Sequence, residues 1–432
     1  MLTNKKKWED ILQAIKPKRH HERNALLNEL QILSQPSNPI NNLIGVINDN
    51  THLNDTLLLG YVYGLGFSSK EIKTQFTALS NHFKAYYDLT NEESLIDSKA
   101  NSLSQSKNKE LANSQNATKD ENNMLAVIAQ DVQNVSAKIE YFTQDITKDA
   151  KEKIVYILDG SDDENDPFKK LDIDSKVLPQ ELKAYYNHLA RMSWKIIESN
   201  AGVLLNSVWK NEVYTDFVNN ISPLYPFNTY SRESVSIETF KGFFGNAGTL
   251  QTFYKQYLSK IIQKKGGAYI PNPTYMSKIK LKEQFLTFFN KTSSLSAMFD
   301  ANNNLTLNFF IQCLDLSSDF SSLDMGYNDT SIHYDHTLHP KLHIIIEHFN
   351  KNTELRLTAN DYYQYPQYKK VYIGEWAWFA FIKDMVPNQN MRNSIYFENN
   401  KKLYFDFNIT NKTELLKILD TLTHFNMPDS IM

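Results

Sequence analysis

The chain has 432 residues, of which 41% are hydrophobic and 12% aromatic, and its formal net charge is -3. Single cores seldom grow past roughly 250–300 residues, so this length predicts two or three domains. The nearly balanced charge gives no reason to expect nucleic acid as a partner. Because Cys313 is the only cysteine, an internal disulfide and a cysteine-based metal site are excluded.

The sequence shows no targeting or membrane segment. The first residues, "MLTNKKKWEDILQAIKPKRHH", lack the apolar core of a signal peptide. Nowhere does the chain run for about 18 apolar residues, the minimum for a membrane span. We therefore expect that anything carrying this chain to a membrane lies outside it.

The first part of the chain is predicted to be helical. Residues 1–90 indicate helices broken by loops, whereas 91–123 are polar, aperiodic and typical of a disordered linker. A helix is expected at 124–142, followed by the acidic loop 159–168. The longest helix begins after Pro179, because apolar residues then recur at spacings of three and four.

The stretch 225–258, "YPFNTYSRESVSIETFKGFFGNAGTLQTFYKQYL", predicts two short helices. Ser236 is placed to cap the first helix, and Gly245 to end it. Thr249 is expected to cap the second, which we predict to run to Gly266-Gly267. Nothing in the stretch is a nucleophile, a base or a set of metal ligands, so it predicts a scaffold.

Beyond that point the pattern changes to β. One more helix is expected at 277–290, then residues 305–313 alternate as on a half-buried strand, and 394–409 read as a hairpin. A short helix closes the chain. The predicted class is α+β, with a mainly antiparallel, β-sandwich-like C-terminal domain. The expected parts are 1–175 (helical, with the linker), 176–267 (helical) and 268–432 (mainly β).

Two polar groups are candidate metal sites. Five histidines, at positions 333, 336, 339, 343 and 348, have spacings that a helix could use for a metal, but Pro340 interrupts them and the flanking "LHIIIEHF" indicates a strand. The acidic loop 159–168 lacks the closing glutamate of a calcium loop. We predict no metal, no cofactor and no catalytic residue.

A tyrosine cluster is the candidate binding surface. Tyr362, Tyr363, Tyr365 and Tyr368 surround Pro366 in "NDYYQYPQYKK", where the proline favours a loop or an edge strand. Tyrosine is frequent at protein interfaces, since it combines apolar area with a hydroxyl. The alternative is a sheet whose tyrosines pack on one face.

The order of these motifs resembles the C-terminal region of the IcmF/TssM family of type VI secretion systems. Two landmarks carry the resemblance over about 180–432, and a missing Trp-Pro-Gly near 347–350 indicates a divergent member. The first landmark consists of Tyr225, Pro226, Phe227, Ser236, Phe240, Phe243, Phe244, Gly245, Gly248 and Phe253. The second, "GEWAWFAF", expected as a strand, contains Gly374, Trp376, Trp378 and Phe379.

The resemblance implies a periplasmic scaffold whose membrane helices are absent from this chain. Its implied partners are a TssJ-like outer-membrane lipoprotein, a TssL/DotU-like inner-membrane protein and other copies of itself. The alternatives are a secreted effector enzyme that cleaves glycans or peptides, and a substrate-binding module. Converging carboxylates in a cleft would favour the enzyme, and a deep apolar pocket would favour the binding module.

Overall fold

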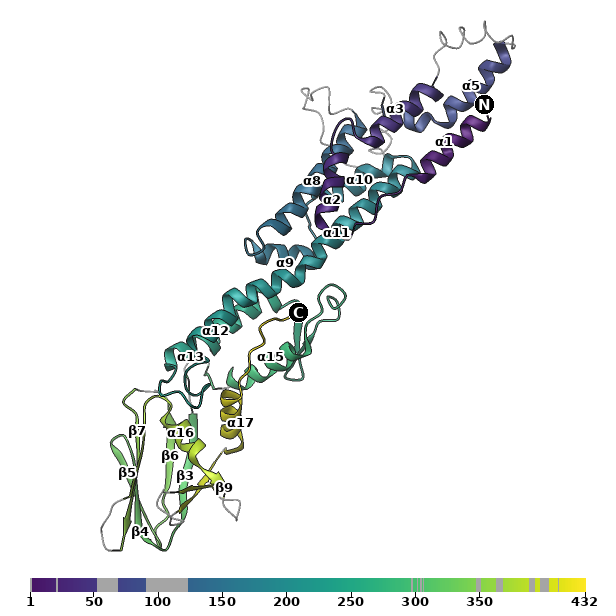
Figure 1. Ribbon diagram of the computed structural model, residues 1–432. Coiled ribbons are helices and arrows are strands. Elements are labelled where there is room, and N and C mark those ends of the chain that lie inside the picture. The colour runs from purple at the N-terminus through teal and green to yellow at the C-terminus, as the bar shows by residue number, and fades with distance from the viewer. Residues whose placement is uncertain are drawn as a thin grey trace, which may run out of the picture. The chain divides into compact units, whose positions relative to one another are not determined.

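The computed structural model describes residues 2–20, 22–52, 69–90, 123–296, 298–300, 302–303, 305, 307–346, 351–362, 368–387, 393–396, 404–410 and 412–432. These residues form two compact units, Met1–Val203 and Leu204–Met432. Helices come first and antiparallel sheets follow, which confirms the α+β class with a terminal helix (Figure 1). Within the described residues, no helix combines the length and apolarity needed to cross a membrane.

The first unit is helical. Its described helices are α1 (Leu2–Ala14), α2 (Arg23–Leu33), α3 (Pro39–Thr51), α5 (Ser69–His82), α6 (Lys84–Tyr87), α8 (Met124–Gln144), α9 (Ala150–Asp159), α10 (Pro167–Asp174) and most of α11 (Gln180–Trp209). Side chains of Asn38, Asn123 and Asp166 accept N–H bonds at the starts of α3, α8 and α10. The predicted helices after 123 and after Pro179 are confirmed, while linker residues 91–122 lie outside the described residues.

Helix α8 is central to this unit. Its residues Ile128, Val132, Val135 and Ile139 form one fully buried stripe. The helix packs against α2 and α10. Each such side chain contributes about 1.5–3 kcal/mol by leaving water, so this stripe holds the three helices together.

The second unit begins with a helical part. Its helices are a π-helical segment (Lys210–Tyr214), α12 (Thr215–Asn220), α13 (Ile237–Phe244), α14 (Thr249–Phe253), a second π-helical segment (Tyr254–Leu258), α15 (Glu283–Ser296), α16 (Ala377–Asp384) and α17 (Lys412–Thr423). The N-cap of α14 is Gly248, so the expected capping role of Thr249 is wrong. The helix expected at 277–290 begins only at Glu283.

The helix predicted to reach Gly266-Gly267 ends at Leu258 instead. Strands β1 (Ile262–Lys265) and β2 (Ala268–Pro271) pair there as a hairpin. The two glycines are its turn, with φ of +60° and +85°. Two successive positive φ angles fit a two-residue hairpin turn better than a helix end, and glycine adopts them without steric cost.

The C-terminal part contains two antiparallel sheets. Their orders are β6-β3-β11-β10-β9 and β5-β4-β7-β8. The strands are β3 (Leu307–Leu316), β4 (Phe320–Tyr327), β5 (Thr330–Asp335), β6 (Lys341–Ile346), β7 (Glu354–Asp361), β8 (Tyr368–Ile373), β9 (Val386–Pro387), β10 (Asn393–Tyr396) and β11 (Tyr404–Ile409). On β3, Phe309, Ile311 and Cys313 are buried while Phe310 and Leu314 are exposed. The predicted alternation and the β10–β11 hairpin are therefore confirmed.

The landmark "GEWAWFAF" is not a strand. Residues Ala377–Asp384 form helix α16, whose side chains reach both sheets. Trp378 contacts Phe309 of β3, and Phe381 contacts Tyr372 of β8. A continuous apolar run does not by itself distinguish a buried strand from a buried helix, which explains the wrong expectation.

Candidate functional site

The phenylalanines of the first landmark form one buried cluster. Phe240, Phe243 and Phe244 lie on the buried face of α13, with exposed fractions of 0%, 1% and 2%. Phe244 stacks on Phe227 with ring centroids 5.7 Å apart, and it meets Phe425 at 5.3 Å. Edge-to-face and offset pairs of this kind add to the free energy gained by burial. The cluster therefore fixes α13 to the segments before and after it.

Two glycines of this landmark are required by close approach. A Cβ at Gly248 would lie 2.8 Å from the backbone of Gly242 and Phe243. At Gly245 a Cβ would lie 2.6 Å from the Lys241 carbonyl. Neither distance is compatible with a side chain, so these glycines allow the chain to reverse tightly after α13.

The start of α13 joins the two landmarks. The Ser236 hydroxyl accepts the Thr239 N–H at 3.1 Å, which confirms the predicted cap. Glu375 accepts the Ile237 N–H at 3.1 Å. Trp376 donates its indole N–H to the Val235 carbonyl at 2.6 Å and packs edge-on against Phe240. Two sequence landmarks far apart in the chain thus form one structural unit.

The remaining landmark residues make contacts of their own. The peptide bond between Tyr225 and Pro226 is cis. The Tyr225 N–H donates to the Glu233 carbonyl at 2.9 Å, and burial, with a smaller contribution from Asp384, raises the pKa of Tyr225 to about 12. Phe253 contacts Trp209, Phe379 contacts Trp376, and the Gly374 N–H donates to the Thr353 carbonyl.

One set of hydrogen bonds in the second unit could not be predicted from any sequence pattern. Trp209 donates its indole N–H to the Pro428 carbonyl at 2.8 Å. Asn206 accepts the N–H groups of Ile431 and Met432 at 2.8 and 3.0 Å. The last residues are therefore bound to the end of α11, a contact that only the tertiary structure creates.

Two residues of the predicted tyrosine cluster are described: Tyr362 directly follows β7, and Tyr368 begins the edge strand β8 of the four-stranded sheet. Tyr363 and Tyr365 lie outside the described residues. Tyr362 is 61% exposed, whereas Tyr368, on β8, is half-buried with its ring 5.4 Å from Phe320. Further along β8, Val371 and Ile373 are exposed, the latter at 71%. Strand β8 ends the order of this sheet and shows apolar side chains on its outer face.

Three of the five candidate metal-binding histidines have separate partners, and the side chains of His343 and His348 lie outside the described residues. His333 contacts the Asp324 carboxylate at 2.7 Å, His336 the Phe320 carbonyl, and His339 the Cys313 carbonyl. Of the acidic loop, Asp166 caps α10. Throughout the part of the chain that the structure describes, no group of three or more His, Cys, Asp or Glu residues could hold a metal ion.

Two domain models match the chain in succession. The helical domain of the type VI secretion protein IcmF matches residues 200–304, and its C2-like domain matches residues 309–411. The first range contains the phenylalanine cluster on α13, and the second contains strands of both sheets. Fold and matches together define a type VI secretion protein with a helical and a C2-like domain. Over these residues the chain belongs to the IcmF/TssM family.

Relatives and solved structures agree with this assignment. The type VI secretion system component TssM1 of Pseudomonas aeruginosa is 20% identical over 180 residues, which is 41% of this chain and 16% of that protein. The chain therefore spans only a small part of that relative. A chain of a type VI secretion system membrane core complex has a TM-score of 0.64 at 15% identity, covering 100% of this chain and 82% of that one. A chain of a type VI membrane complex gives 0.62 at 13%, covering 100% and 78%. The two structural likenesses show a shared fold.

Proposed function

We propose that this chain is a non-enzymatic scaffold in the periplasmic part of a type VI secretion membrane complex. The succession of IcmF helical and C2-like domains over residues 200–411 carries the proposal. Two chains of similar fold come from membrane complexes of such systems. A scaffold works by burying surface against its partners, so its functional residues are exposed contacts and the packing that holds them.

The outer edge of the four-stranded sheet is our candidate for the lipoprotein contact. The edge strand β8 carries exposed Val371 and Ile373, and Tyr362 lies beyond the end of the neighbouring strand β7. Edge strands can accept a further strand, and apolar and tyrosine side chains give such an interface its burial. We propose that a TssJ-like outer-membrane lipoprotein binds along this edge, with Tyr363, Tyr365 and Tyr368 as further contacts.

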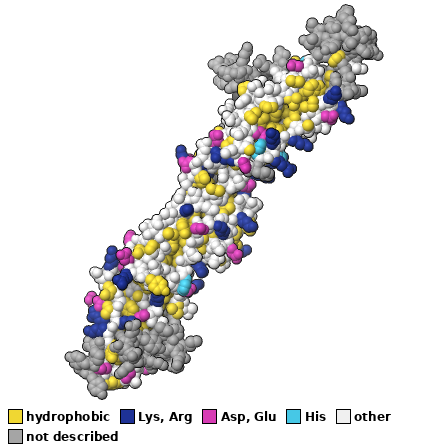
Figure 2. Space-filling view, viewed as in Figure 1, with side chains coloured by type: hydrophobic (Ala, Val, Ile, Leu, Met, Phe, Trp, Pro, Cys, Tyr) yellow, Lys and Arg dark blue, Asp and Glu magenta, His cyan; other side chains and the backbone are white. Residues whose placement is uncertain are grey.

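Other surfaces serve the remaining partners in this proposal. On the face shown in Figure 2, basic and acidic side chains are interspersed rather than gathered into areas of one sign. Such a surface suits protein partners more than a polyanion. We propose that helical surfaces meet neighbouring copies of the chain and a TssL/DotU-like protein.

Calorimetry with a purified TssJ-like lipoprotein tests the edge. The variant Tyr362→Ala/Ile373→Ser should bind the lipoprotein at least about tenfold more weakly, because it loses two of the proposed contacts. Both side chains are exposed, so their loss leaves the core intact. Leu338→Ser is the matched control, since Leu338 is 53% exposed in the same domain but lies between β5 and β6. Equal affinities for the wild type and a folded double variant would refute the contact. The Tyr363→Ala/Tyr365→Ala variant tests the neighbouring tyrosines in the same way.

A further inference from the structure

Tyr230 stands out among the tyrosines of the second unit. It is 95% exposed, more than any other large apolar side chain in the part of the chain that the structure describes. It lies between Pro223 and Val235, in a segment that we call the Tyr230 loop. Tyrosine combines apolar area with a hydroxyl and is frequent where protein surfaces bind most tightly, so this ring is a candidate contact.

Hydrogen bonds inside the Tyr230 loop fix its backbone. The Asn228 side chain accepts the Tyr230 N–H at 3.0 Å. The Ser231 hydroxyl and the Tyr225 N–H both donate to the Glu233 carbonyl, at 2.8 and 2.9 Å. The exposed ring is therefore carried on an ordered backbone, and such preorganisation lowers the entropic cost of binding.

The first unit has a hollow of about 610 Å³ between α10 and α11, which we call the α10–α11 hollow. Phe168 and Trp194 are its aromatic lining, with ring centroids 5.5 Å apart and ring planes at 86°. Its other lining residues are Asp172, Asn187, Ala190, Arg191, Lys195 and Glu198. Those on α11 recur at intervals of three or four, so they form one stripe along that helix.

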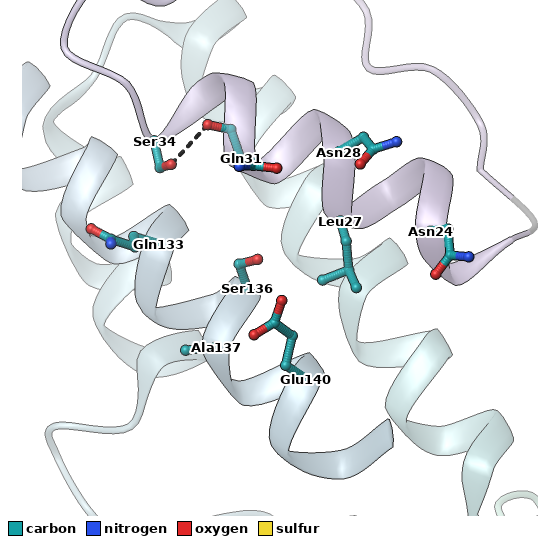
Figure 3. A pocket seen from close by; sticks show the side chains of 9 residues that line it. All are labelled: Asn24, Leu27, Asn28, Gln31, Ser34, Gln133, Ser136, Ala137 and Glu140. Carbon is teal, nitrogen blue, oxygen red and sulfur yellow. Dashed lines mark hydrogen bonds between the residues drawn. The ribbon is translucent and has the colours of Figure 1, made fainter. Parts of the chain in front are cut away.

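The groove between α2 and α8 in the same unit is lined differently (Figure 3). Its side chains are polar apart from Leu27 and Ala137, and none of the described residues that line it is aromatic. The α10–α11 hollow presents rings together with charges of both signs. It therefore fits an aromatic side chain that has charged neighbours.

We propose that Tyr230 of one copy of the chain docks in the α10–α11 hollow of a second copy. The inference rests on the proposed scaffold role, in which copies meet, and it names the two surfaces that meet. In the hollow the tyrosine ring gains edge-on or offset pairing with Trp194 and Phe168. Asn187 in the lining offers an acceptor for its hydroxyl.

The charges beside the two surfaces are complementary. Arg232 and Glu233 follow Tyr230 in the loop, and both are exposed. In the hollow, Glu198 is available to pair with Arg232, and Lys195 with Glu233. These four side chains form no ion pair with one another or with any other described residue of the chain, so they are free to pair across a contact between copies.

The contact joins two different surfaces, because the Tyr230 loop belongs to the second unit and the hollow to the first. Such a heterologous contact leaves one loop and one hollow unused in a pair of copies. A copy that has lost its ring can therefore still bind through its hollow, and a copy with a blocked hollow can still bind through its ring.

Sedimentation velocity of the full chain over a concentration series measures the contact. Tyr230→Ala and Ala190→Arg should each weaken self-association at least about tenfold, because one removes the docking ring and the other fills the hollow. Met276→Ala and Ala137→Arg are the matched controls and should associate like the wild type. Met276 is 56% exposed in the second unit, and Ala137 lines the α2–α8 groove of the first.

A mixture of the two weakened variants gives the sharpest test. Tyr230→Ala keeps an intact hollow and Ala190→Arg keeps an intact ring, so the mixture should form pairs that neither variant forms alone. The inference is overturned if the wild type stays monomeric throughout the series, if either variant associates as strongly as the wild type, or if the mixture stays monomeric.

The scaffold role is tested separately by calorimetry with the lipoprotein. If the Tyr230→Ala chain self-associates like the wild type while the wild type binds the lipoprotein, the docking of Tyr230 is refuted and the scaffold role stands. If the lipoprotein does not bind but the mixture forms pairs, the contact between copies stands and the lipoprotein contact fails.

Discussion

The indole N–H of Trp376 donates to the backbone carbonyl of Val235 at 2.6 Å, and this bond joins the segment before α13 to the segment before α16. Trp376 is 2% exposed, so the bond is made away from water. Trp376→Phe leaves a buried carbonyl without this donor and should lower the free energy of unfolding by about 1–3 kcal/mol. Urea denaturation followed by circular dichroism measures the loss.

Trp378 provides a matched control for that substitution. It is equally buried, but within the described structure its indole nitrogen has no hydrogen-bond partner. Trp378→Phe therefore removes similar volume without breaking a bond, and it should cost less than Trp376→Phe. Equal losses in the two variants would show that packing, and not the bond to Val235, accounts for the effect of Trp376.

Gly248 and Gly242 should respond in opposite ways to alanine. A Cβ at Gly248 would stand 2.8 Å from backbone atoms, whereas at Gly242 nothing lies within 4 Å. Gly248→Ala should cost about 1–3 kcal/mol, since the backbone must shift. Gly242→Ala, inside α13, should stabilise by about 0.5–1 kcal/mol, because alanine restricts the unfolded chain. In thermal denaturation, the melting temperature of Gly248→Ala should therefore be lower than that of the wild type, and that of Gly242→Ala should be higher.

Truncating Phe244 tests whether the phenylalanine cluster is core or interface. The side chain is 2% exposed and contacts Phe227 and Phe425. Phe244→Ala, like Phe243→Ala, should cost roughly 3–5 kcal/mol in chemical denaturation. A variant of normal stability that no longer binds a partner protein would instead show that the phenylalanine cluster is a contact surface.

The sequence predicted local features well and long-range ones poorly. The helix after residue 123, the alternation on β3 and the Ser236 cap follow from periodicity and from one hydroxyl at a helix start, which act over a few residues. The bond from Trp376 to Val235 depends on two segments that only the folded chain brings together. The predicted helix end at Gly266-Gly267 is wrong because glycine is favoured both at helix ends and in hairpin turns.

We expect the buried carboxyl group of Asp131 to give the first unit a pH-dependent stability. Asp131 lies on α8 with 4% exposure, and its Oδ2 has no hydrogen-bond partner in the described structure. Burial, then a hydrogen bond and charge repulsion from Asp174 on α10, raise its pKa from 3.8 to about 7, while Lys170 acts in the opposite direction. Burial and a nearby carboxylate both disfavour the charged form of Asp131, so the α8–α10 contact favours its protonated form.

The sign of the pH effect follows from this raised pKa. Between about pH 4 and pH 7 the folded state holds a proton that the unfolded state has released, so the stabilisation is complete below about pH 4 and lost as the pH rises to about 7. The free energy of unfolding should fall by a few kcal/mol at most over that range. Hydrogen exchange of α8 amides at a series of pH values, corrected for the intrinsic rates, measures it. Asp131→Asn should flatten the dependence, while Asp172→Asn, an exposed change on α10, should preserve it. A wild-type profile already as flat as that of Asp131→Asn would show that the Asp131 carboxyl group is ionised in the folded state.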